Sequence, residues 1–227
     1  MAPSILATEA LLAEISTRLE KLPDRRTADL RHLRREFSKR LAKVEAGVML
    51  DFALHLLQRP GIEYRFLSYE LMAHHPAALA SLGSKELLQL GRGMDSWGAV
   101  DMFGCYLAGP AWRQLQVSDH LIHRWAKSSD RWWRRAALVS TVPLNSKARG
   151  GQGDGQRTLE VCRLLVGDRD DMVVKAMSWA LRELSKRDKQ VVRKFLVEQQ
   201  TALAARILRE VRHKLATGLK NPRKTKN

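Results

Sequence analysis

The chain has 227 residues, which is long enough to bury a core, and its 44% hydrophobic and 28% charged residues are typical of a soluble globular protein. No apolar run approaches the roughly 18 to 20 residues that a membrane span requires, so no spanning segment is expected. The net charge of +16 favours a polyanionic partner, because each phosphate that the protein neutralises releases bound counterions.

The cations gather toward both ends of the chain. Residues 18–43 hold ten Lys and Arg against four Asp and Glu, and residues 201–227 hold eight against one. Phosphate contact is the favoured interpretation of the first segment, with a solvated surface as the alternative. Residues 216–227 are expected to form a basic, disordered tail.

Apolar spacing predicts one helix after another and no strand. The expected helices span residues 4–21, 26–43, 45–58, 62–74, 84–92, 97–107, 111–126, 131–141, 156–166, 171–186, 189–198 and 201–215. Pro23, Pro60, Pro76, Pro110 and Pro143 all fall between these segments, as expected for a residue that cannot donate to the helical ladder. The chain is therefore predicted to be all-α.

The start of the chain and its cysteines indicate the compartment. The opening residues lack a cationic start ahead of an apolar block, so they predict a helix and not a secretory signal, and the mature protein is expected to start near Met1. Cys105 and Cys162 lie within apolar helical patterns, which predicts buried thiols. The expected location is the reducing cytoplasm of a bacterium, in association with the nucleoid.

An internal repeat appears at an offset of 40 residues, where Asp130-Arg-Trp-Trp-Arg-Arg-Ala136 aligns with Asp170-Asp-Met-Val-Val-Lys-Ala176. A looser copy over residues 95–101 has an acid in place of the base, with the register slipped by one. This period is typical of HEAT-like repeats, which stack into a solenoid, an α-α superhelix with a concave, here basic, face. One such domain is predicted over residues 1–215, with an irregular helical bundle as the alternative.

Residues 145–157, NSKARGGQGDGQR, form the one segment that predicts a flexible insertion. Its glycines follow no strand and precede no Gly-Lys-Ser/Thr, so they do not indicate a phosphate-binding loop. We expect a mobile loop that does not divide the domain.

The repeat alignment also predicts a candidate site. Asp101, Arg135 and Lys175 take comparable positions on successive inner helices. Trp97 lies four residues before Asp101, and Trp179 lies four after Lys175, so each pair shares a helix face. A basic face with two tryptophans and a single acid suits a nucleic-acid strand better than a small metabolite.

Three stretches of the chain carry a more specific pattern. They are Trp97-Gly-Ala-Val-Asp101, Trp133-Arg-Arg135-Ala-Ala-Leu138 and Val174-Lys-Ala-Met-Ser-Trp179-Ala-Leu-Arg182-Glu183. Together they resemble the signature of AlkD-type DNA glycosylases, HEAT-like repeat proteins that excise positively charged alkylpurines from duplex DNA. The resemblance is good over residues 84–200, extends in helical layout from residue 26, and is weak in the first helix.

The resemblance implies a role for each matched residue. Trp97 and Trp179 would line the cleft around the backbone and sugar of the damaged nucleotide, and Asp101 would be the catalytic carboxylate. Arg135 would hold the phosphate, with the adjacent Arg134 as the alternative. In this family the lesion is thought to be handled without inserting the base into a deep pocket, unlike in most glycosylases.

The chemistry agrees with a single acid. An N3- or N7-alkylated purine already carries positive charge and departs readily, so one carboxylate can stabilise the oxocarbenium-like sugar and orient a water. Neutral leaving groups generally require two carboxylates. No cofactor is expected.

Taken singly, most of these residues also have a structural interpretation. A tryptophan at helical spacing is usually core, and Arg135 could hold a repeat turn by a salt bridge. Lys175 and Arg182 face the predicted groove and could contact phosphate, but Arg182 and Glu183 could equally form an intrahelical pair. Packing is the interpretation of three further tryptophans, Trp112, Trp125 and Trp132.

Other polar clusters carry weaker signals. The histidine pairs lack the partners of a zinc site, so no metal is expected and surface or capping roles are favoured. These residues are His74, His75, His120 and His123. Many relatives carry an aromatic residue on an early helix, where this chain offers Arg31, His32, Arg34 and Arg35.

The leading hypothesis is a monofunctional glycosylase that acts as a monomer on double-stranded DNA containing alkylated bases and leaves an abasic site. The alternative is a non-catalytic module that binds damaged or branched DNA through shape and charge. A protein–protein scaffold is a third class, although its concave face would not need to be basic.

Overall fold

A computed structural model describes residues 5–220, with side chains from residue 9 onward. All regular elements in this range are helical, which confirms the prediction of an all-α, helical-repeat fold. Within residues 5–220, none of the helices has the length and apolar character to cross a membrane. Residues 216 and 217 are helical, whereas residues 221–227 of the expected tail lie outside the described part.

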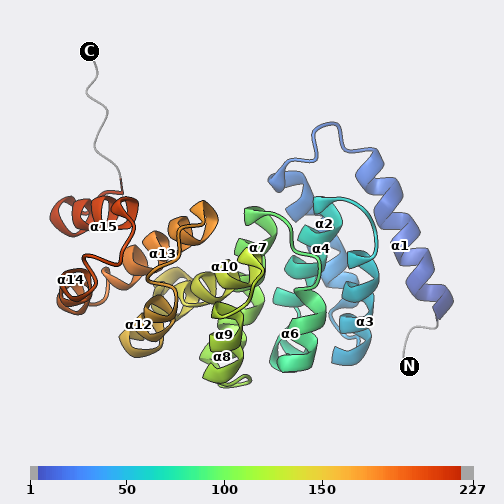
Figure 1. The fold of residues 1–227 in the computed structure, drawn as a ribbon. Coiled ribbons are helices and arrows are strands. Elements are labelled where there is room, and N and C mark those ends of the chain that lie inside the picture. The colour runs from blue at the N-terminus through green and yellow to red at the C-terminus, as the bar shows by residue number, and fades with distance from the viewer. Residues whose placement is uncertain (1–4, 221–227) are drawn as a thin grey trace, which may run out of the picture. The chain divides into compact units, whose positions relative to one another are not determined.

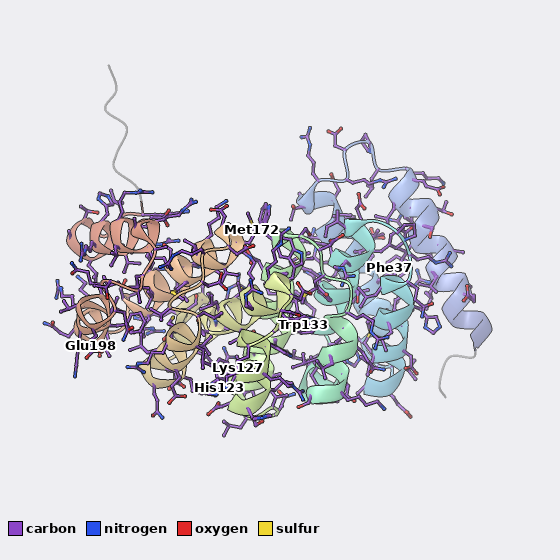
Figure 2. All side chains as sticks on the ribbon, in the orientation of Figure 1. Phe37, His123, Lys127, Trp133, Met172 and Glu198 are labelled. Carbon is purple, nitrogen blue, oxygen red and sulfur yellow. The ribbon has the colours of Figure 1, made fainter. Side chains whose placement is uncertain are left out.

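The chain forms two compact units, Met1–Gly93 and Met94–Asn227, and the prediction of one continuous domain stays a prediction. The first unit contains α1 (Ile5–Glu20), α2 (Thr27–Leu41), α3 (Ala46–Leu57), α4 (Ile62–Ala73), α5 (Pro76–Ala80) and α6 (Ser84–Leu90). In this unit α4 packs against α2 and α3, and Phe37 and Tyr69 are among the largest buried side chains. Figure 2 labels Phe37.

The short helix α5 was not predicted. It begins at Pro76, because the first helical position needs no N–H donor. His75 caps it by accepting a hydrogen bond from the backbone N–H of Ala78, at 3.1 Å, which confirms the expected capping role for this histidine.

Two basic residues of α2, Arg31 and Arg34, neutralise a buried acid. The Glu70 side chain is only 3% exposed and accepts hydrogen bonds from Arg31 Nε at 3.3 Å and from Arg34 Nε at 3.2 Å. Leaving this carboxylate unpaired would be costly, so both arginines contribute to the fold of the first unit. His32 instead pairs with Glu36, and Arg35 is exposed.

The second unit contains the candidate site. Its elements are α7 (Trp97–Phe103), the π-helix η1 (Gly104–Ala108), α8 (Gly109–Arg113), α9 (Asp119–Ala126), α10 (Arg131–Ser140), α11 (Val142–Asn145), the short η2 (Lys147–Arg149), α12 (Gly155–Leu164), α13 (Asp171–Leu184), α14 (Lys189–Glu198) and α15 (Ala205–Thr217). The helix α10 packs against both α7 and α13, and α13 packs against α15 (Figure 1). Helix α9 packs against α10, α12 packs against α9 and α13, and α14 packs against α13 and α15.

Equivalent N-caps set the register of the repeats. Ser96, Asp130 and Asp170 are the N-cap residues of α7, α10 and α13, and each side chain accepts a hydrogen bond from a backbone N–H of the first turn. Counting five residues on from each cap gives Asp101, Arg135 and Lys175. The three therefore hold equivalent positions, as predicted, and the apparent slip in the first copy disappears because its cap is Ser96 and not Asp95.

The prediction that Pro110 separates two helices was wrong. A π-helical segment, Gly104–Ala108, joins α7 to α8, and Pro110 lies within the first turn of α8. The wider π-turn accommodates a residue that has no N–H and would clash with a carbonyl of the preceding turn. The predicted helix over residues 111–126 instead breaks at Leu115, whose φ of 60° is left-handed.

Two glycines, one in the π-segment and one at the start of α8, allow a close approach to the end of α10. A Cβ atom at Gly104 would lie 2.8 Å from Val139 Cγ1, and one at Gly109 would lie 2.7 Å from the carbonyl oxygen of Ser140. Both distances are too short for a real contact. Because these two positions lack a Cβ atom, α7, which carries Asp101, can lie close to α10, which carries Arg135.

The segment over residues 145–157 is not the free loop that was predicted. The buried Asn145 donates to Thr158 Oγ1 at 2.8 Å and accepts from the backbone N–H of Asp154 at 2.9 Å. Arg113 donates to the carbonyl oxygens of Pro143 and Arg149, and Arg187 donates to those of Asn145 and Gly151. These side chains satisfy the backbone of a segment that periodicity alone left without partners.

Candidate active site

One open pocket of 480 Å³ in the second unit collects most of the predicted site residues. It is lined by Trp97, Asp101, Arg135, Met172, Lys175, Trp179, Arg182, Arg206, Glu210 and Lys220, and we call it the tryptophan pocket. Arg134 is the one predicted residue outside it. Its guanidinium pairs with Asp168 at 2.7 Å and donates to the carbonyl oxygens of Ser128 and Ser129.

Asp101 and Arg135 form a bidentate ion pair. Arg135 Nε donates to Asp101 Oδ1, and Arg135 Nη2 donates to Asp101 Oδ2, both at 2.9 Å. The remaining terminal nitrogen, Nη1, donates to the carbonyl oxygen of Met172 at 2.5 Å. One side chain of α10 therefore bonds to its neighbours on both sides, α7 and α13.

The environment of Asp101 sets its charge. Its side chain is 20% exposed, whereas that of Arg135 is 6% exposed. Burial raises the pKa of Asp101 above its usual value, and the hydrogen bonds and charge of Arg135 act in the opposite direction. Arg135 thus favours the carboxylate form of an acid that remains accessible from the pocket.

The phosphate role expected for Arg135 receives no direct support from this geometry. All three of its guanidinium nitrogens have partners within the protein, and the residue is only 5% exposed. A bidentate Arg–carboxylate pair is geometrically specific. In the structure Arg135 therefore orients Asp101.

The tryptophans of this unit differ in exposure, and Trp132 and Trp133 outside the pocket are partly exposed, as Trp179 is. Trp97 is 62% exposed at the first position of α7, and Trp179 is half-buried on α13. Trp112 and Trp125 are buried, which confirms their interpretation as packing. An exposed indole at the rim of a pocket is unusual for a residue that serves only the core.

An aromatic cluster joins α7, α9 and α10. The ring centroids of Phe103 and Trp125 are 5.7 Å apart, and those of Trp125 and Trp133 are 4.9 Å apart. Trp133 lies on α10, and in Figure 2 Met172 lies at the opposite edge of this unit from His123 on α9 and from Lys127, which follows α9. Phe103 and Trp125 belong to the buried core, Trp133 is partly exposed, and His123 is not a pocket residue.

The wall supplied by α15 was missed from the sequence. Arg206, Glu210 and Lys220 line the pocket, although the repeat offset does not extend to them. Glu210 accepts hydrogen bonds from Ser178 Oγ at 2.6 Å and from Arg206 Nε at 2.9 Å. The sequence did offer one indication of this wall: Arg206 and Glu210 are four residues apart in a very basic segment, which places both on one helix face.

Other reactive groups lie apart from the pocket. Cys105 and Cys162 are buried free thiols, and burial raises the pKa of each to about 12, as expected for packing residues. Among residues 5–220, no cluster of His, Cys, Asp and Glu has the makings of a metal site.

Fold and pocket together define a helical-repeat protein with a cation-rich, tryptophan-lined pocket around a bidentate ion pair. A protein-family profile described as DNA alkylation repair enzyme matches residues 25–215. The chain belongs to this family, so it is an enzyme of DNA repair that binds DNA. No curated protein shows significant similarity to the chain.

Proposed function

We propose that this protein is a DNA glycosylase that hydrolyses the N-glycosidic bond of N3- and N7-alkylated purines in duplex DNA, with Asp101 as the catalytic carboxylate. The observation that carries the proposal is the Asp101–Arg135 pair inside a pocket that also holds Trp97 and Trp179. Family membership supports the type of damage.

The pocket suits a reaction in which the leaving group needs little help. When the bond from C1′ to the purine nitrogen breaks, its electron pair neutralises the cationic base, and positive charge develops on the sugar. Asp101 stabilises that oxocarbenium-like sugar and accepts a proton from the attacking water. The two indole rings flank the sugar and backbone, whose C–H groups pack well on aromatic faces.

Arg135 acts in this proposal through Asp101, as a positioning residue. Its hydrogen bonds fix both carboxylate oxygens and, with its charge, oppose the rise in the pKa of Asp101 that burial causes. Lysine would not replace it, because an ammonium cannot make the same planar, two-pronged contact. Contact with phosphate then falls to other pocket cations, Lys175 and Arg182 among them.

The test is base release from duplex DNA containing 7-methylguanine, under single-turnover conditions. Asp101→Asn is expected to lower the rate by about 100-fold or more, since it removes the charge that stabilises the transition state. Its affinity for undamaged duplex is expected to be equal to or slightly greater than that of the wild type. Release at the wild-type rate by this variant would exclude the mechanism.

A matched control is Asp188→Asn. Asp188 is an exposed N-cap of α14 outside the pocket, and asparagine caps a helix as well as aspartate does. This variant is expected to release base at the wild-type rate. Selective binding of junctions without base release by the wild type would instead favour the non-catalytic DNA-binding module.

A further inference from the structure

Charge is unevenly distributed within the tryptophan pocket. At one end the carboxylate of Asp101 and the guanidinium of Arg135 neutralise each other. At the other end, where α13 and α15 pack together (Figure 1), four cations line the pocket against one carboxylate. These residues are Lys175, Arg182, Arg206, Lys220 and Glu210.

The cations at this end have unused donors. Arg182 Nε donates to Ser178 Oγ at 3.2 Å, but its two terminal nitrogens have no hydrogen-bond partner among the described residues. Arg206 bonds to Glu210 through Nε and to Asp171 through Nη1, and its Nη2 has no partner in residues 5–220. Lys220 is exposed, and the described part of the chain offers it no ion-pair partner.

Arg182 is the informative member of this group because it is buried without full compensation. Its side chain is only 14% exposed, and its nearest carboxylate contact is Glu210, at 4.0 Å from Nε. Burial lowers the pKa of Arg182 below its usual value, which reflects the cost of holding this charge away from water. An anion in the pocket would offset that cost and take up the free donors.

Glu210 holds this end of the pocket in place. The residue is 8% exposed, and its two carboxylate oxygens accept hydrogen bonds from Ser178 and Arg206. Burial acts to raise the pKa of Glu210, but these hydrogen bonds and the charges of Arg206 and Lys220 together outweigh it, and the pKa is lowered. The carboxylate therefore remains ionised and orients the arginines, and its oxygens are already occupied.

We propose that Arg182, Arg206 and Lys220 form a phosphate subsite that binds a phosphodiester of the DNA strand, with Glu210 as a positioning residue. The planar guanidinium group matches the oxygens of phosphate, and two such groups with one ammonium suit a single phosphodiester. The inference rests on the proposed function, because it assumes that the damaged nucleotide of the same strand occupies the Asp101 end.

The test measures affinity for a duplex with a tetrahydrofuran abasic-site analogue over a range of salt concentrations. Arg182→Gln and Arg206→Gln are each expected to weaken binding about 10-fold or more and to reduce the slope of log affinity against log salt by about one. The single-turnover rate of 7-methylguanine release at saturating enzyme is expected to fall much less.

Matched variants keep the outcome clear. Arg193→Gln removes an exposed arginine of α14 outside the pocket and is expected to change neither affinity nor slope. Arg182→Lys keeps the charge and is expected to restore the slope but only part of the affinity. If Arg182→Gln unfolds, the Arg206 and Lys220 variants carry the same test, because both side chains are more exposed.

Two outcomes separate this inference from the proposed function. Base release by the wild type, together with Arg182 and Arg206 variants that behave like Arg193→Gln, would overturn the subsite and leave the glycosylase standing. No base release, together with the expected losses of affinity and slope, would overturn the glycosylase and leave the subsite standing.

A separate variant tests the positioning role of Glu210. Glu210→Gln leaves the number of cations unchanged but loosens the arginines, so we expect weaker binding with an unaltered salt slope. Tighter binding by this variant would show that Glu210 repels the anion, and would overturn its positioning role.

Discussion

Replacing Arg135 with methionine removes three hydrogen bonds and one charge at nearly constant volume. Two of the bonds reach the Asp101 carboxylate, and the third reaches the carbonyl oxygen of Met172. Breaking a buried ion pair by removing one partner costs about 3 to 5 kcal/mol. Because the Asp101 side chain is 20% exposed and solvent compensates part of the loss, we expect the free energy of unfolding to fall by about 2 to 4 kcal/mol near neutral pH.

The loss is expected to depend on pH in one direction. Without Arg135, burial alone acts on Asp101, so its pKa rises further above the usual value. An acid with a higher pKa in the folded than in the unfolded state destabilises the fold when ionised. The penalty is therefore full above the folded-state pKa and shrinks as the pH falls through it. Urea unfolding at about pH 7 and about pH 5 measures the difference.

A double-mutant cycle isolates the ion pair. In an Asp101→Asn background, Arg135→Met is expected to cost only about 1 kcal/mol, the value of its bond to Met172. The difference between this cost and the cost of about 2 to 4 kcal/mol in the wild type gives a coupling free energy of about 1 to 3 kcal/mol between the two substitutions. Strict additivity, together with a penalty that does not change with pH, would refute a structural link between these two side chains.

Two further predictions concern the pocket and its support. Trp97→Ala is expected to change the free energy of unfolding by less than about 0.5 kcal/mol, because the side chain is 62% exposed. The same variant is expected to slow base release strongly. Equal losses of stability and of activity would show that Trp97 serves the fold. Gly109→Ala places a Cβ atom 2.7 Å from the carbonyl oxygen of Ser140. Thermal unfolding should therefore show that the free energy of unfolding falls by about 1 to 3 kcal/mol. The control is Gly47→Ala, where a Cβ atom meets nothing within 4 Å, and this variant should be nearly neutral or stabilising.

The inner-helix register could be predicted because it depends on local chemistry. An N-cap acid followed by an apolar period recurs at Asp130 and Asp170, so the offset of 40 residues was visible in the sequence. The same offset predicted that Asp101, Arg135 and Lys175 hold equivalent places. Their grouping in one pocket follows from stacking equivalent helices side by side.

Features that depend on tertiary packing could not be predicted in this way. The pairing of Arg135 with Asp101, and not with a ligand, depends on how closely α7 approaches α10, which in turn depends on Gly104 and Gly109. The anchoring of residues 145–157 depends on Arg113 and Arg187, which are distant in sequence. Neither apolar period nor composition carries information on such contacts.

The geometry around Asp101 depends on three helices at once, so a fragment of the chain would not reproduce it. The guanidinium that orients the acid is rooted in α10, its target lies on α7, and its third bond ends at the start of α13. A designer who wished to graft this acid onto another scaffold would have to transplant α7, α10 and α13 with their spacing intact. A peptide or a single exchanged repeat would carry the residues but lose their geometry.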